Sequence, residues 1–106
     1  LTAEQRISAL SLYKSLNKAK ELIDSGIRDA AKIIDAATEL IQSYPETVID
    51  YIAICDPETL VDIKDINRPV VMALAVKVGK ARLIDNMILN QQQTDFKTKE
   101  TQGDIL

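Results

Sequence analysis

The chain has 106 residues, an apolar share of 46%, a formal net charge of −3, no histidine and one cysteine. This length fits one domain, and the mild acidic balance without a basic stripe disfavours nucleic-acid binding. The missing histidines remove the commonest general base and most transition-metal sites, and a lone cysteine excludes an intramolecular disulfide and multi-cysteine zinc clusters.

That cysteine, Cys55, lies in an apolar stretch, where a small buried thiol is expected in preference to a reactive thiolate. A reduced, cytoplasmic compartment fits this usage best. No secretory signal is visible, and the longest strictly apolar run, 70–76, is too short to span a bilayer. The chain starts at Leu1 and not at Met, so we expect a processed product or a segment of something longer.

Two amphipathic helices are predicted first. Thr2 and Gln5 have the spacing of a capping box, and the first helix should run to about Asp24, where Gly26 ends it. Its apolar face is expected to hold Ala9, Leu12, Tyr13, Leu16, Ala19 and Ile23.

The second helix should begin at the cap residue Asp29 and end near Ser43, because the residue before Pro45 is pushed out of the helical region. Its apolar stripe comprises Ala30, Ile33, Ile34, Ala37, Leu40, Ile41 and Tyr44. Two such helices with a short connector form an antiparallel pair whose apolar faces need a further layer.

Strands supply that layer. Residues 48–55 are rich in β-branched side chains, residues 56–59 have the chemistry of a type I turn, and residues 60–63 are predicted as a short return strand. The almost continuously apolar run 70–78 is typical of a central strand covered on both faces.

A two-residue loop with glycine first, Gly79-Lys80, suits a type II′ hairpin, after which residues 81–89 should return antiparallel. The predicted fold is therefore α+β, with two N-terminal amphipathic helices packed on a small, mostly antiparallel β-sheet. Residues 90–106 read as a polar tail, which we expect to be disordered because it offers little apolar surface.

Two segments carry a resemblance to a known family. Residues 50–60 read DYIAICDPETL and residues 79–86 read GKARLIDN. Behind the leading LTAEQR of residues 1–6, they closely resemble the C-terminal domain of the pantothenate synthetase (pantoate–β-alanine ligase) family, which has D-Y-x-x-x-x-D-P-E-T-L and G-x-x-R-L-I-D-N in this order. The resemblance extends from Leu1 to about Asn86.

The resemblance implies a ligase of the coenzyme A pathway that uses ATP and Mg²⁺. Pantoate is activated as an acyl adenylate, and the amine of β-alanine then displaces AMP. The family's nucleotide site lies in an N-terminal Rossmann-like domain with His-x-Gly-His and Ser-Ser-Arg-Asn elements, which are absent here. We therefore assign no catalytic residue, metal site or bound cofactor to this chain, which should be inactive alone.

By the same resemblance, residues 1–89 are expected to act as a lid that closes over the adenylate and excludes water. The N-terminal domain is then the partner, and the whole enzyme is expected to be a homodimer. The alternative is a standalone protein-interaction or dimerisation module whose working surface is a helix stripe or a free sheet edge.

Three basic residues near the hairpin, Lys77, Lys80 and Arg82, are the candidates for approaching a phosphate when the lid closes. Lys77 should face Arg82 across the hairpin, and two like charges directly opposite each other favour a nearby anion. The alternative, which we prefer, is that Arg82 pairs with a carboxylate of its own domain, such as Asp50 or Asp56, and locks the sheet.

Four other polar residues have plain structural explanations. Asp85 and Asn86 come near a strand end, where such side chains usually bond local backbone. Glu4 and Arg6 begin the first helix, where contact with the missing domain and simple solvation are both plausible.

Two acidic positions in the resemblance segments are also explained without catalysis. Asp50 interrupts the strand face expected to hold Val48, Ile52 and Ile54, which suggests a hydrogen-bonded or rim position. The acidic pair in Asp56-Pro57-Glu58 is accounted for by turn formation.

Overall fold

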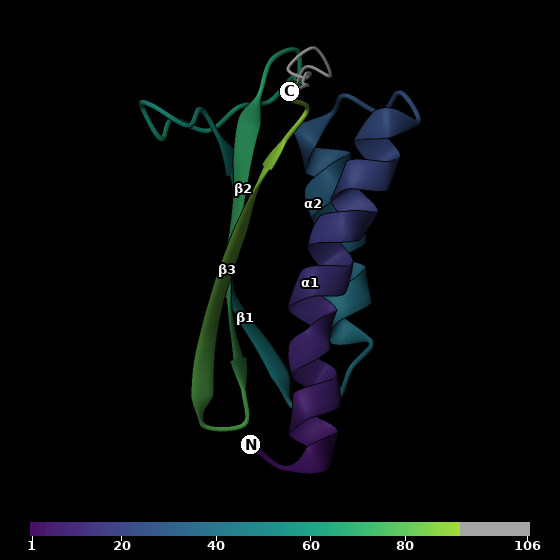
Figure 1. Ribbon diagram of the computed structural model, residues 1–106, viewed down its shortest axis with the longest axis vertical. Helices are drawn as coiled ribbons and strands as arrows, with labels where there is room; N and C mark the ends of the chain where they lie inside the picture. The colour runs from purple at the N-terminus through teal and green to yellow at the C-terminus, as the bar shows by residue number, and fades with distance from the viewer. Residues whose placement is uncertain (92–106) are drawn as a thin grey trace, which may run out of the picture.

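Two helices cover one face of a three-stranded sheet in the computed structural model, which describes residues 1–91 (Figure 1). The elements are α1 (Ala3–Asp24), α2 (Ala30–Gln42), β1 (Thr47–Cys55), β2 (Val70–Val78) and β3 (Ala81–Leu89). The strand order is β1-β2-β3, and both pairs are antiparallel. The predicted α+β fold is confirmed, whereas most of the predicted tail, residues 92–106, lies outside the described residues.

Helix α1 begins with the predicted capping box. The Gln5 N–H donates to the Thr2 hydroxyl (3.0 Å), and the Thr2 N–H donates to the Gln5 side chain (2.9 Å). The prediction for Tyr13 was wrong, since its side chain is 59% exposed. The positions that α1 turns inward also include three fully buried serines, Ser8, Ser11 and Ser15. The buried stripe of α1 is therefore centred further toward these serines than the apolar residues alone indicate, and Tyr13 lies outside it.

Helix α2 is capped by Asp29, whose carboxylate accepts from the Ala31 N–H (3.0 Å), and it ends within one residue of the predicted boundary. Its start is tied to the 56–69 loop by two backbone bonds, from the Ala30 N–H to the Lys64 carbonyl (3.0 Å) and from the Ile66 N–H to the Arg28 carbonyl (2.8 Å). The loop is therefore fixed to the helical layer as well as to the sheet.

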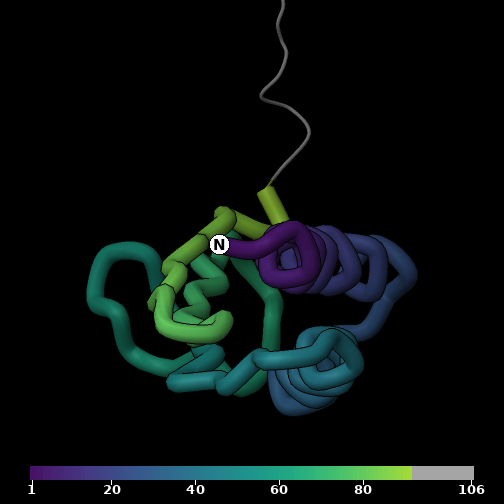
Figure 2. Tube along the Cα trace, turned by 90° about the horizontal axis from the view of Figure 1, so that it is seen from below, coloured from purple at the N-terminus to yellow at the C-terminus, as the bar shows by residue number. Residues whose placement is uncertain are grey.

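Strand β2 is central, and five of its side chains turn toward the helices and are fully buried: Val70, Met72, Leu74, Val76 and Val78. Contrary to the sequence prediction, no helix of the described chain covers the other face of the sheet (Figure 2). The outward side chains of β2 include Ala73 and Ala75, and in register Ala75 lies between Tyr51 and Ile84. The strand therefore has an apolar sequence without a covering layer on its outer face, because the small outward residues are shielded by side chains of β1 and β3.

The predicted return strand at residues 60–63 does not form. A single bridge joins Cys55 and Asp62, and the turn closes over five residues, because the Leu60 N–H donates to the Asp56 carbonyl (2.9 Å). Leu60 has a left-handed backbone conformation (φ 62°), which is incompatible with a strand. The first part of the 56–69 loop consequently projects from the sheet on the side away from the helices (Figures 1 and 2), whereas residues 64–66 return to the start of α2.

Candidate functional site

The β2–β3 hairpin places the three candidate cations near one end of the sheet. Its two-residue loop is confirmed by the pairing of Val78 with Ala81, and Gly79 has the positive φ (60°) that this loop requires. Lys77 pairs with Arg82 across the hairpin, as predicted. Within residues 1–91, Lys77 and Lys80 are exposed and form no salt bridge.

Arg82 is held within its own domain. Its Nε lies 2.7 Å from Oδ2 of Asp50, and the two side chains are 48% and 30% exposed. The ion pair of the preferred sequence interpretation is therefore present, with Asp50 as the partner of Arg82. Because Asp50 and Arg82 belong to the two segments that carry the family resemblance, at least part of that signature is architectural.

A β-bulge brings Asp50 to this position. The register of β1 against β2 shifts between Ile49 and Tyr51, so Asp50 is an extra residue without a partner. The expected face of Val48 with Ile52 and Ile54 was consequently wrong: Ile49 packs against the core with the two later isoleucines, and Val48 is 60% exposed. The bulge reverses the alternation that a regular strand would have kept.

A hollow of about 530 Å³ lies beside the hairpin, lined by Leu1, Gln5, Glu46, Gly79, Lys80 and Ala81. Gln5 Nε2 donates to Glu46 Oε1 (3.0 Å), and the Gly79 N–H donates to the Glu46 carbonyl (3.1 Å). A side chain at Gly79 would collide with Gln5. These contacts join the start of α1, the α2–β1 turn and the hairpin into one unit. In the sequence, only the capping box gave any sign of Gln5, and nothing marked Glu46.

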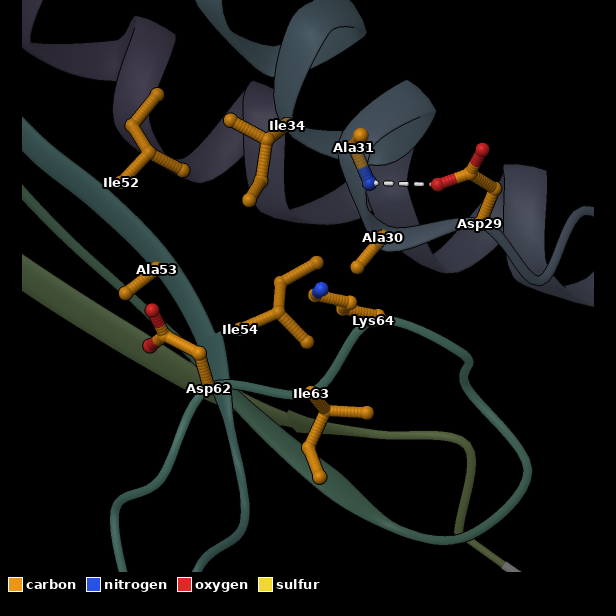
Figure 3. A pocket seen from close by; sticks show the side chains of 10 residues that line it. All are labelled: Asp29, Ala30, Ala31, Ile34, Ile52, Ala53, Ile54, Asp62, Ile63 and Lys64. Atoms are coloured by element: carbon orange, nitrogen blue, oxygen red, sulfur yellow. Dashed lines mark hydrogen bonds between the residues drawn. The ribbon is translucent and has the colours of Figure 1, made fainter.

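A second hollow, of about 370 Å³, lies between the start of α2, the end of β1 and the loop at residues 62–64 (Figure 3). Its walls are mostly aliphatic, with Ile34, Ile52 and Ile63 among them, and the charged residues Asp29, Asp62 and Lys64 also line it. The Asp29 carboxylate is already engaged as the cap of α2. The second hollow therefore offers mainly apolar surface, and one of its three charged side chains, Asp29, is already hydrogen-bonded.

The Asp56-Pro57-Glu58 segment is a turn, as predicted. Asp56 Oδ1 accepts from the N–H groups of Glu58 (2.8 Å) and Thr59 (3.0 Å), and Asp56 Oδ2 lies 3.6 Å from Arg68. The two backbone N–H groups, with a smaller contribution from Arg68, hold the pKa of Asp56 below its usual value. An ionised carboxylate committed to its own loop is not a general acid.

The remaining candidates are structural or exposed. Cys55 is buried, and burial together with the nearby Asp62 charge raises the pKa of its thiol, so the predicted unreactive thiol is supported. Asp85 and Asn86 lie in the middle of β3 and not near its end as predicted, and Asp85 Oδ1 accepts from the adjacent Asn86 N–H (2.8 Å). Glu4 and Arg6 are exposed on the first turns of α1.

The described residues do not suit a metal. Among residues 1–91, no group of three or more histidine, cysteine, aspartate or glutamate side chains is placed to hold an ion. Over the same range, no helix is both long and apolar enough to cross a bilayer.

Comparison with known proteins gives one consistent match. A family model described as pantoate-beta-alanine ligase matches residues 1–88. The pantothenate synthetase of Desulfatibacillum aliphaticivorans is 51% identical over 89 residues, which cover 84% of this chain and 32% of that protein. The pantothenate synthetase of Fervidobacterium nodosum is 54% identical over 90 residues, which cover 85% and 32%.

A solved structure agrees. The crystal structure of pantothenate synthetase from Thermus thermophilus matches with a TM-score of 0.75 at 34% sequence identity. The match covers 82% of this chain and 31% of that chain. The present chain thus spans about a third of the length of the relatives that it matches.

Proposed function

The chain belongs to the pantoate–β-alanine ligase family, corresponding to its C-terminal domain, and we propose that residues 1–89 act as the lid of an ATP-dependent ligase. Such an enzyme joins pantoate to β-alanine and makes pantothenate. The observation that carries the proposal is the match over residues 1–88 to proteins about three times as long as the matched region.

In this proposal the chemistry occurs on the rest of the enzyme, which binds ATP and Mg²⁺ and forms the pantoyl adenylate. The present domain closes over that intermediate and keeps water from the reactive anhydride until the amine arrives. A two-layer body with a fully buried core suits this task, because it moves as a unit.

The contacts of Gln5, Glu46 and Gly79 support a rigid movement of the hairpin. They join the first turn of α1 to the β2–β3 loop, so a rotation at Leu1 would carry Lys80 with it. Lys77 and Lys80 are the cations that we propose to approach the phosphates in the closed enzyme. Arg82 would contribute by holding the sheet through Asp50.

We further propose that the partner of this domain is the nucleotide-binding domain of the same enzyme. A homodimeric enzyme in the cytoplasm is the assembly that we expect. Cytoplasmic reducing conditions suit the buried, unpaired thiol of Cys55.

A chimeric ligase tests the proposal. Residues 1–91 replace the corresponding domain of a relative, and the chimera is compared with that relative truncated before the domain. The chimera should form pantothenate and AMP in equal amounts, whereas the truncated enzyme should form less pantothenate and hydrolyse its adenylate. A folded chimera that makes no more pantothenate than the truncated enzyme would contradict the proposal.

The cations are tested in the same chimera. Lys80→Ala should lower kcat/KM by about tenfold, which corresponds to the loss of one charge-assisted contact of about 1.4 kcal/mol. Lys32→Ala is the matched control, because Lys32 is also exposed but lies on α2, away from the hairpin and the 56–69 loop. Equal effects of the two substitutions would exclude a specific role for Lys80.

A further inference from the structure

The face of the sheet that the helices leave open carries a set of exposed apolar side chains. Val48 and Tyr51 on β1 are 60% and 42% exposed, and Ile84 and Ile88 on β3 are 60% and 41% exposed. The register places all four on the side opposite the core: Tyr51 and Ile84 flank Ala75 of β2, Val48 lies beside Lys77, and Ile88 lies beside Val71. We call this surface the open sheet face. Asn86 lies on it between Ile84 and Ile88, and such a group of exposed apolar side chains with polar residues around them is a feature of interaction sites.

The 56–69 loop extends this surface. Its first part projects on the same side and presents Leu60 and Val61, which are 67% and 63% exposed. Leu60 has a left-handed conformation (φ 62°), which is unfavourable for a leucine and is not compensated by burial. The Asp56 carboxylate fixes the loop through two backbone N–H groups. The backbone that carries the two apolar side chains is thus ordered before any partner arrives, which lowers the entropy lost on binding.

Charge completes the open sheet face. The bulge at Asp50 leaves its carboxylate free to reach Arg82 across β2, and Lys77 pairs in register with Arg82 and Val48. The face therefore combines aliphatic residues, a tyrosine and a fixed arginine, with one unpaired lysine among the described residues. Tyrosine and arginine are enriched at protein–protein interfaces, and interfaces between domains of one chain are more polar than obligate ones.

We infer that the open sheet face, with Leu60 and Val61, is the surface by which this domain packs on the catalytic part of the ligase when the lid closes. The inference rests on the proposed function and adds which face of the lid is turned inward. The catalytic part is the occupant because about two thirds of the relatives' length lies outside the matched region. In a ligase that part joins at Leu1, which lies beside the β2–β3 loop at the end of this same sheet.

A competing surface exists on α1, where Ile7, Leu10 and Tyr13 are 56%, 54% and 59% exposed. It lacks the features that distinguish the open sheet face. These are a loop with a left-handed leucine held by Asp56, the ion pair that joins Asp50 on β1 to Arg82 on β3, and cations close to the hairpin. The competition allows a matched experiment, since Ile84 and Ile7 are the same residue type at 60% and 56% exposure.

The test uses the chimeric ligase with Ile84→Lys or Ile7→Lys. Ile84→Lys should lower kcat/KM for pantothenate synthesis at least about tenfold, the loss expected at the centre of an interface. It should also raise the AMP formed per pantothenate above one, because an imperfectly closed site admits water. Ile7→Lys should stay within about twofold of the unsubstituted chimera in both measurements.

Folding is controlled separately. Thermal unfolding of the isolated chain should be little changed by either lysine, since both positions are exposed. If Ile84→Lys unfolds the chain, Val61→Lys in the loop takes its place and should give the same loss of synthesis and the same excess of AMP.

Four outcomes would overturn the inference. A loss with Ile7→Lys and none with Ile84→Lys would assign the contact to α1, and no effect of either would mean that neither face is covered. A dimer of the isolated chain at micromolar concentration that Ile84→Lys dissociates would assign the face to a second copy. An inactive unsubstituted chimera would reject the proposed function itself, which distinguishes that failure from failure of the docking surface alone.

Discussion

Replacing Ser11 with alanine should stabilise the protein, although it removes a polar side chain. The Ser11 hydroxyl is fully buried and has no hydrogen-bond partner among the described residues. An unpaired buried hydroxyl costs about 1–3 kcal/mol, and alanine is preferred to serine in a helix by about 0.5 kcal/mol. Loss of some packing around the removed oxygen offsets part of this gain, so we expect Ser11→Ala to raise the free energy of unfolding by about 1–2 kcal/mol.

Ser8→Ala is the matched control on the same helix. Ser8 is equally buried, but its hydroxyl donates to the Pro45 carbonyl (2.8 Å). Losing that bond costs about 1 kcal/mol, and the helix preference of alanine returns about 0.5 kcal/mol. Ser8→Ala should therefore lower the free energy of unfolding by about 0.5 kcal/mol, opposite in sign to Ser11→Ala.

Urea unfolding followed by circular dichroism measures both variants, and thermal unfolding provides a second readout. For a domain of this size, each 1 kcal/mol moves the thermal midpoint by about 4–8 °C. Destabilisation by Ser11→Ala would contradict this expectation, because the hydroxyl would then have a partner, such as a carbonyl of the preceding helical turn. Equal shifts of both variants in the same direction would also contradict it, because helix preference alone would then explain them.

Three further predictions concern the hairpin and the loop. Gly79→Ala should lower the free energy of unfolding by about 2 kcal/mol in urea titrations, because alanine at φ 60° is strained and its Cβ displaces Gln5; an unchanged midpoint would show that the hairpin adapts freely. A double-mutant cycle of Arg82→Ala and Asp50→Ala should give a coupling energy of only about 0.2–1 kcal/mol, because the pair is partly exposed and screened. This coupling energy should shrink in 1 M salt. Asp56 has a lowered pKa, so its contribution to stability is present above the unfolded-state pKa and is lost as pH falls through the folded-state value. Asp56→Asn should flatten this acid limb of the stability profile, and an identical limb in both proteins would assign the pH dependence elsewhere.

Local chemistry made much of the fold predictable. Capping at Thr2 and Asp29, the two-residue loop at Gly79 and the lengths of five elements depend on residues adjacent in sequence, and the structure has them where they were predicted. The sequence predicted that Arg82 pairs with a carboxylate of its own domain, such as Asp50 or Asp56, and the structure selects Asp50. The family resemblance depends on the same local segments.

The errors have two sources. Tyr13 was placed in the core by its spacing, but the packing of α1 on α2 and the sheet buries the stripe that runs through Ser8, Ser11 and Ser15 instead, and Tyr13 lies outside that stripe. The strand at residues 60–63 was lost for a local reason, because the turn at Asp56 closed one residue later than expected and put Leu60 in a left-handed conformation.

The candidate site divides in the same way. By itself the sequence determined which elements form, because helix caps, turn residues and apolar periodicity act over a few residues. Only the tertiary structure decided which faces they present. A single extra residue at Asp50 reversed the inward and outward positions of β1, and the contact of Gln5 and Glu46 with Gly79 joined three segments that no local pattern connects. Which side chains of a helix or strand point to the core depends on packing between segments distant in sequence, so it is determined only when the chain folds.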